Sequence, residues 1–114
     1  MKRLEAIIPT ERLNAVNEAL KKVGIGGVTV IDSKGRGAGK REPVAGARGT
    51  MYYIPEFHAR TTLITVVDDS KVDDVINAIL GAASTGSPGD GKIFITNVED
   101  VVDIGSKKRG PGAL

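Results

Sequence analysis

The stretch Thr85-Gly86-Ser87-Pro88-Gly89-Asp90-Gly91-Lys92-Ile93-Phe94-Ile95 organises the chain, because a glycine-punctuated loop leads directly into an apolar strand. Its three glycines let the backbone adopt positive φ and turn successive N–H groups toward one point, the arrangement by which backbone binds phosphate. Lys92 adds a full positive charge at the rim. Two interpretations follow: a phosphate-binding loop, or a structural turn between a helix and a strand.

The same letters fit the pattern G-x-x-x-x-G-K of an ordinary nucleotide-binding P-loop, but two features speak against that interpretation. Ile93 stands where the metal-binding Ser or Thr should be. The order of elements is also reversed, because a P-loop leaves a strand and opens a helix. Here the loop follows a helix expected at about residues 71–84 and opens a strand.

Length and composition restrict the class of protein. The 114 residues are enough for a single domain with one modest core, so we expect one domain over residues 1–114, with a tail from about residue 105. No apolar run approaches ~20 residues and no signal-peptide pattern is present, which predicts a cytoplasmic protein. The absence of cysteine excludes disulfides and thiolate sites, and the single histidine, His58, excludes a multi-histidine metal site within one chain.

Charge points to anionic ligands rather than nucleic acid. The net charge of +2 is too small to indicate nucleic-acid binding, and two Phe, two Tyr and no Trp offer little surface for stacking bases. Basic residues nevertheless cluster in residues 34–48 and at Lys107, Lys108 and Arg109.

Hydrophobic periodicity predicts the fold. Strands are expected at residues 4–8, 28–31, 61–67 and 92–96, with a long loop over about residues 35–59. The helix pattern Leu13-x-x-Val16-x-x-x-Leu20 recurs as Val72-x-x-Val75-x-x-x-Ile79. Two βαβ halves make an α+β, ferredoxin-like (split βαβ) domain with an antiparallel sheet and helices on one face. We expect the other sheet face to be buried in a homo-oligomer, through Leu4, Ala6, Ile8, Leu63, Thr65 and Val67.

Three segments carry a resemblance to a known family. They are the strand at residues 27–30 leading into Lys34-Gly35-Arg36-Gly37, the segment at residues 48–52, and the glycine loop. With the order of elements, they make the chain similar to the PII signal-transduction proteins of nitrogen metabolism over nearly its whole length. The resemblance implies a homotrimer that is not an enzyme and that binds ATP or ADP in clefts between subunits. It also implies 2-oxoglutarate and Mg²⁺ as further ligands, and a T-loop (residues 35–59) that docks on ammonium transporters or glutamine synthetase, with recruitment to the membrane through a transporter.

The resemblance also assigns roles by position. Thr29 would meet the adenine or ribose, Val66 would form an apolar wall of the adenine pocket, and Arg60 stands where the family has a 2-oxoglutarate-binding lysine. Tyr52 falls near the tyrosine that bacterial members modify. The expected nucleotide-binding residues are Thr29, Gly35, Arg36, Gly37, Val66, Gly89, Asp90, Gly91 and Lys92.

Two departures from the family pattern affect the mechanism. The family's phosphate-binding Arg-x-Arg is Asp103-Ile104-Gly105 here. Losing two charge-assisted bonds of on the order of 1.5–3 kcal/mol each would weaken triphosphate binding by roughly two to four decades. Either the basic residues Lys107, Lys108 and Arg109, or Arg36 in the loop, replace them, or the tail is simply a solvated basic segment. The family's glutamine after the loop-base glycines is also missing, because Ala38 and Gly39 follow Gly37, and this puts 2-oxoglutarate binding in question.

Other classes of function fit less well. An enzyme that used Lys92 and Asp90 for phosphoryl transfer would lack a nucleophile with a partner base, and Asp90 is more simply a turn residue. An RNA-binding domain would need aromatic residues on its central strands. A PII-like sensor of a different metabolite remains an alternative. The loop cations Arg36, Lys40, Arg41 and Arg48 suit an acidic partner surface.

Overall fold

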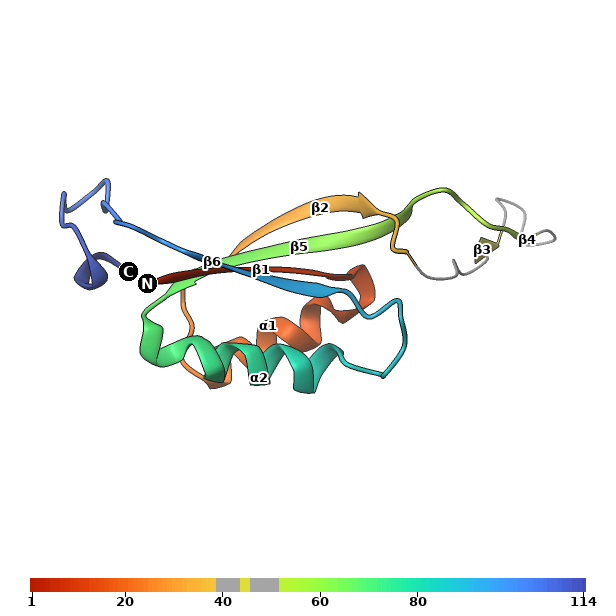
Figure 1. The fold of residues 1–114 in the computed structure, drawn as a ribbon, viewed down its shortest axis with the longest axis horizontal. Helices are drawn as coiled ribbons and strands as arrows, with labels where there is room; N and C mark the ends of the chain where they lie inside the picture. Colours follow the sequence, from red (N-terminus) through yellow and green to blue (C-terminus); the bar gives the residue numbers. More distant parts are fainter. Residues whose placement is uncertain (39–43, 46–51) are drawn as a thin grey trace.

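The computed structural model describes residues 1–38, 44–45 and 52–114, with the backbone alone at residues 44–45 and 52–53 (Figure 1). Short 3-10 helices cover Thr10–Arg12, Asp69–Lys71 and Pro111–Ala113. The strands and α-helices, in chain order, are β1 (Lys2–Pro9), α1 (Leu13–Lys22), β2 (Thr29–Gly35), β3 (Val44–Ala45), β4 (Tyr52–Tyr53), β5 (His58–Val67), α2 (Val72–Ala83) and β6 (Lys92–Asn97).

The main sheet has the order β2-β5-β1-β6, with every neighbouring pair antiparallel. Both α-helices lie on the same face of this sheet (Figure 1). This is the expected α+β architecture, and its order of strands and helices is consistent with the ferredoxin-like plan. β3 and β4 form a separate two-stranded pair within the long loop between β2 and β5.

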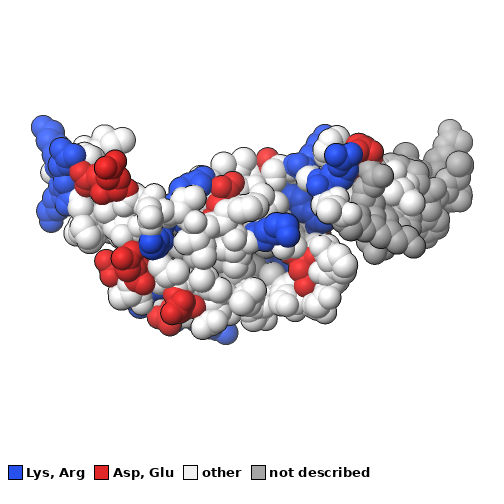
Figure 2. Space-filling view, viewed as in Figure 1, with Lys and Arg blue, Asp and Glu red and all other residues white. Residues whose placement is uncertain are grey.

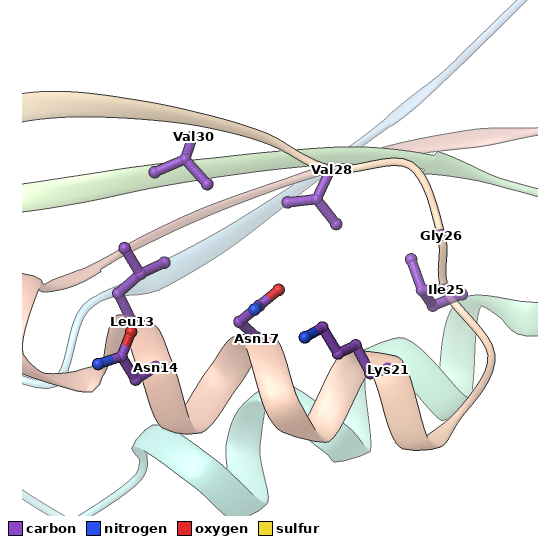
Figure 3. Close-up of a pocket in the computed structure, with 8 residues that line it drawn as sticks. All are labelled: Leu13, Asn14, Asn17, Lys21, Ile25, Gly26, Val28 and Val30. Carbon is purple, nitrogen blue, oxygen red and sulfur yellow. The ribbon is translucent and has the colours of Figure 1, made fainter.

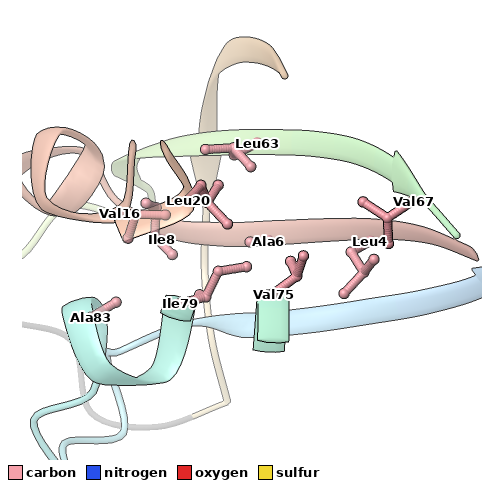
Figure 4. Close-up of a cluster of buried hydrophobic side chains, with 10 residues drawn as sticks. All are labelled: Leu4, Ala6, Ile8, Val16, Leu20, Leu63, Val67, Val75, Ile79 and Ala83. Atoms are coloured by element: carbon pink, nitrogen blue, oxygen red, sulfur yellow. The ribbon is translucent and has the colours of Figure 1, made fainter. Parts of the chain in front are cut away.

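The core forms where the two helices meet the sheet, as Figure 4 shows. Because α1 and α2 share one spacing of apolar residues, each presents a single stripe to the strands. Val16 and Leu20 from α1 and Val75 from α2 are fully buried. Their partners in the buried cluster are Leu4, Ala6, Ile8, Leu63, Val67, Ile79 and Ala83.

The prediction of which sheet face stays uncovered was wrong. Leu4, Ala6, Ile8, Leu63, Thr65 and Val67 are all buried within the single chain, under the helices. Two helices of about 10 Å diameter are wide enough to cover four strands spaced about 4.8 Å apart, so no second layer is needed there. The helix-free face instead carries the strand residues that alternate with the buried ones. Its apolar side chains are Ile7, Ile31, Ile64, Val66 and Phe94.

Element boundaries differ from the sequence predictions mainly beside the long loop. β2 continues to Gly35 and β5 begins at His58, because the two strands keep pairing up to the Gly35–His58 register position. At the C-terminal end, Val102 and Arg109 form a single isolated bridge.

Candidate functional site

The glycine loop between α2 and β6 is closed by one side chain, that of Asp90. Its carboxylate accepts hydrogen bonds from the Thr85 backbone N–H at 2.6 Å, the Thr85 hydroxyl at 2.5 Å and the Gly86 N–H at 2.9 Å. These bonds, led by the one from the Thr85 hydroxyl, hold the pKa of the Asp90 carboxyl below its usual value. Asp90 therefore shapes the loop.

Several loop amides bond within the loop itself. Besides the two that donate to Asp90, the Gly89 N–H donates to the Ser87 hydroxyl at 3.3 Å and the Asp90 N–H to the Ser87 carbonyl at 3.2 Å. The sequence predicted amides converging on an external anion. In this conformation they converge on the loop's own oxygen atoms, and the bonds to Ser87 are longer than those to Asp90.

The end of the loop is anchored to the sheet. Gly91 has φ of +110° and passes directly over the backbone of Ile7 on β1. Lys92 then begins β6 as the register partner of Ile7. Since Ile7 belongs to the helix-free face, the exposed Lys92 side chain belongs to that face as well.

The base of the long loop lies at the same end of the sheet. Gly35, the last residue of β2, pairs with His58, and a Cβ built on Gly35 would lie 3.3 Å from Cγ of Arg60. Next along the chain, Arg36 Nη1 donates to Glu56 Oε1 at 2.5 Å. The structure thus brings Gly35 close to Arg60, the residue expected to bind an effector.

The glycine loop and the base of the long loop lie at the same end of the sheet, because β1 and β2 end there and β5 and β6 begin there (Figure 1). Arg60 and Lys92 flank β1 on the helix-free face, at register positions Pro9 and Ile7. Strand spacing and rise place their Cα atoms roughly 12 Å apart. Two cations at this separation, with exposed backbone nearby, can hold an anionic ligand longer than a single phosphate.

The other predicted ligand contacts lie at the opposite end of the sheet. Thr29 starts β2 and Val66 lies one residue before the end of β5. Thr29 is six residues from Gly35, so about 20 Å of strand separates them. The C-terminal tail is also at this far end, beyond β6 (Figure 1). A single chain therefore does not bring Thr29, Val66 and the tail together with the glycine loop.

The C-terminal tail is a tight turn held by two aspartates. Asp100 accepts from Arg109 Nη2 at 2.6 Å and Nε at 3.0 Å, and Asp103 accepts from the Ser106 N–H at 2.8 Å. The hydrogen bonds from Arg109 lower the pKa of Asp100, and hydrogen bonds from Ser106, first from its side chain and then from its backbone N–H, lower that of Asp103. Arg109 is exposed but bonded to Asp100 within its own tail, and Lys107 and Lys108 are exposed as well. Figure 2 shows this basic group at the tail and another beside the grey loop.

The described part of the chain contains at least two shallow cavities. The larger, of about 300 Å³, lies between α1 and the open edge of β2, where Asn17 and Lys21 point toward Val28 and Val30 (Figure 3). The smaller, of about 200 Å³, lies beneath the glycine loop and is lined by Ile8, Ile79, Leu80, Ala83, Ser84, Asp90, Gly91, Lys92 and Ile93.

Comparison with known proteins gives a consistent result. A family model described as "Nitrogen regulatory protein P-II" matches residues 1–108. Proteins named Nitrogen regulatory protein P-II from Azospirillum brasilense and Rhizobium meliloti are 44% and 41% identical, each over the full length of both chains. Nitrogen regulatory protein P-II 1 from Methanothermobacter thermautotrophicus is 41% identical over the whole chain and 97% of the relative. The chain belongs to the P-II family. Membership supports a regulatory role in nitrogen metabolism.

Three residues that shape the glycine loop, the base of the long loop and the tail of this P-II chain were missed by the sequence analysis: Thr85, Glu56 and Asp100, respectively. Thr85 stands five residues from Asp90, so a loop-closing Thr–Asp pair was within reach of local reasoning. Glu56 and Asp100 lie 20 and 9 residues from their arginine partners, and no local spacing links them.

Some predictions for this P-II chain fall outside the described residues. The loop cations Lys40, Arg41 and Arg48 do, as does the side chain of Tyr52, whose backbone belongs to β4. Within the described part of the chain, no group of three His, Cys, Asp or Glu residues could hold a metal ion. In that same part, neither helix is long and apolar enough to cross a bilayer.

Proposed function

We propose that this P-II chain is a signal-transduction protein that binds ATP or ADP in clefts between the subunits of a homotrimer. The observation that supports this is the separation of the expected contacts onto opposite ends of one sheet. A single site containing both groups needs the glycine-loop end of one chain beside the tail end of a second. Such a head-to-tail contact is heterologous, and it closes into a ring when repeated around an axis.

The helix-free face supports the same assembly. Ile31 and Phe94 are 47% and 48% exposed, and Ile7, Ile64 and Val66 lie between them on the central strands. Arg3, Glu5 and Thr62 lie at the register positions between these apolar residues. Exposed apolar side chains grouped in this way, with polar residues among them, are typical of a surface that another chain covers. Three copies around one axis would bury it and would form three equivalent clefts at their edges.

In this site, Lys92 and Arg36 from one subunit contact the phosphates, together with the backbone of residues 35–37 and 89–91. The phosphate oxygens take over the longer amide bonds to Ser87, while Asp90 keeps the loop in shape. Thr29 and Val66 contribute to the adenine end. Lys107 and Lys108 of the neighbouring subunit supply the charge that the family's two missing arginines would have carried.

A second ligand, 2-oxoglutarate with Mg²⁺ and ATP, is assigned to Arg60. A guanidinium matches a carboxylate in a two-pronged geometry, and Arg60 lies against the loop base at Gly35. Because Ala38 and Gly39 follow Gly37, the family's glutamine is absent, which removes one side-chain ligand. We therefore expect weaker effector binding. A second candidate function is a P-II sensor tuned to a different metabolite, which is favoured because Asp103 and Gly105 stand where the family has two arginines.

The output is a change in the T-loop, residues 35–59, and therefore in partner binding. Gly35 and Arg36 belong both to the ligand end of β2 and to the start of the loop, so a ligand that prefers one loop conformation shifts the population toward it. The partners are an ammonium transporter or glutamine synthetase, with the cytoplasmic protein recruited to the membrane by the transporter. Its loop cations suit an acidic surface.

Light scattering and thermal unfolding test this function. We expect a trimer whose unfolding temperature rises with ATP or ADP, since a ligand bound only to the folded state stabilises it. Lys92→Ala should reduce the rise, whereas Lys71→Ala, at an exposed position before α2, should not. A monomer, or a chain that no adenine nucleotide protects, contradicts the proposal. A pull-down with and without ATP then identifies the partner, and calorimetry with ATP, Mg²⁺ and 2-oxoglutarate tests the effector.

A further inference from the structure

We propose that Glu56 is a latch that competes with bound nucleotide for Arg36, so that nucleotide binding releases the base of the long loop. This inference rests on the proposed nucleotide site. It adds a residue from the far arm of the loop, Glu56, which neither the sequence motifs nor the family resemblance assigns.

The latch continues the β2–β5 ladder by one more contact. The two strands run side by side toward the long loop (Figure 1), and their last register pair is Gly35 with His58. Immediately beyond it, Arg36 Nη1 and Glu56 Oε1 form an ion pair at 2.5 Å. The ion pair therefore joins the two ends of residues 37–55.

Both side chains are open to a competing ligand, being 57% and 53% exposed. An arginine guanidinium binds phosphate and carboxylate with the same two-pronged geometry, and a nucleotide brings several negative charges where Glu56 brings one. A phosphate group at Arg36 also repels the Glu56 carboxylate, because like charges this close disfavour each other. The two anions thus exclude one another from Arg36.

Mutual exclusion couples the loop to the ligand in both directions. If nucleotide binding opens the latch, then removing the latch must strengthen nucleotide binding by the same factor. Exposed ion pairs are weak, so the expected gain in affinity is small, about two- to fivefold. The latch is accordingly easy for a nucleotide to open.

The test compares the full chain with Glu56→Gln, which keeps the shape of the side chain and removes its charge. Calorimetry with ATP should show about two- to fivefold tighter binding by the variant. Limited trypsin digestion gives an independent readout, through cleavage after Lys40, Arg41 and Arg48 followed by mass spectrometry. Without nucleotide, the variant should be cut faster than the wild type. ATP should speed cleavage of the wild type and leave the variant unchanged.

Glu18→Gln is the matched control, since Glu18 forms another exposed ion pair, with Lys21 on α1 at 3.3 Å. It should change neither affinity nor cleavage. Equal or weaker ATP binding by Glu56→Gln, or the same response of both proteins to ATP in the digestion, overturns the latch. Absence of ATP binding by the wild type instead contradicts the proposed function. In that case the digestion without nucleotide still tests the latch. Equal cleavage of the wild type and Glu56→Gln would overturn it.

Discussion

A Cβ atom built on Gly91 would lie 1.9 Å from the carbonyl oxygen of Ile7. The glycine loop therefore enters β6 by passing directly over the backbone of β1, at a distance that no side chain allows. The φ of +110° at Gly91 is a second reason for glycine, because residues with a side chain rarely adopt it. This contact fixes where Lys92 enters the sheet, and with it the position of the whole loop.

Replacing Gly91 with alanine should destabilise the fold strongly. The new methyl group must displace backbone rather than a flexible side chain, and it adds strain at a positive φ. We expect a loss of about 2–4 kcal/mol in the free energy of unfolding, measured by urea denaturation at fixed protein concentration. Gly89→Ala is the control, since its Cβ would meet only the Ser87 hydroxyl, at 3.9 Å. Equal losses in the two variants would show that the close approach to Ile7 is not limiting.

Asp90 should make the loop sensitive to acid. Hydrogen bonds from Thr85 and Gly86 lower the pKa of the folded-state carboxyl below the usual 3.8. A lowered pKa means that the stabilisation is complete above pH 4 and disappears as the pH falls through the folded-state value. In Asp90→Asn this contribution is absent at every pH.

The measurement is the urea midpoint of wild type and Asp90→Asn from pH 7 down to pH 2.5. Asp68, Asp100 and Asp103 also have lowered pKa values, but their contributions are common to both proteins. The difference between the two proteins should therefore be constant above pH 4 and shrink below it. A difference that stays constant down to pH 2.5 would argue against an ionised Asp90 closing the loop.

Mixing two defective subunits should restore nucleotide binding if each cleft uses the glycine loop of one chain and the tail of another. Lys92→Ala disables the first part, and the double variant Lys107→Ala/Lys108→Ala disables the second. Each homotrimer should bind ATP at least about tenfold more weakly, since each change removes charge-assisted contacts. In randomly mixed trimers, about a quarter of the clefts would combine an intact loop with an intact tail.

Titration of the mixture with a fluorescent ATP analogue reports the fraction of tight sites. Tight sites in the mixture, absent from both parents, are the expected result. If the mixture binds as weakly as its parents, the two groups do not share a cleft. A double variant that binds ATP normally would remove the tail lysines from the site.

Phe94→Lys should break the trimer without unfolding the chain. Phe94 lies on the helix-free face opposite Glu5 of β1, so a lysine there meets a carboxylate within its own sheet. In the assembled ring, the same lysine would be buried near its copies, which is costly. Light scattering should give a monomer while circular dichroism stays unchanged. Asn77→Lys, at an exposed position on α2, should remain trimeric.

The order of elements was predictable because it depends on local spacing. The two eight-residue apolar patterns on α1 and α2 identify the helices and the residues they bury, and the β-branched runs identify the strands. Side chains alternate between the two faces of a strand, and the spacing does not reveal which of the two faces lies under the helices. The assignment of Leu4 and Leu63 to the uncovered face was wrong for that reason.

The same distinction separates the residues of the candidate site that could be predicted from those that could not. Lys92 and the glycines around Asp90 were recognisable because they follow one another along the chain. The partners Glu56 of Arg36 and Asp100 of Arg109 were not, because sheet pairing or a tail turn brings each to its arginine.

The amino-acid sequence alone determines the family, the α+β order of elements and the position of the glycine loop, since all three depend on contiguous residues. Only the tertiary structure decides that the expected ligand contacts divide between the two ends of one sheet. Antiparallel pairing causes this division, because it places the ends of β1 and β2 beside the starts of β5 and β6, and sends Thr29 and the C-terminal tail to the far end.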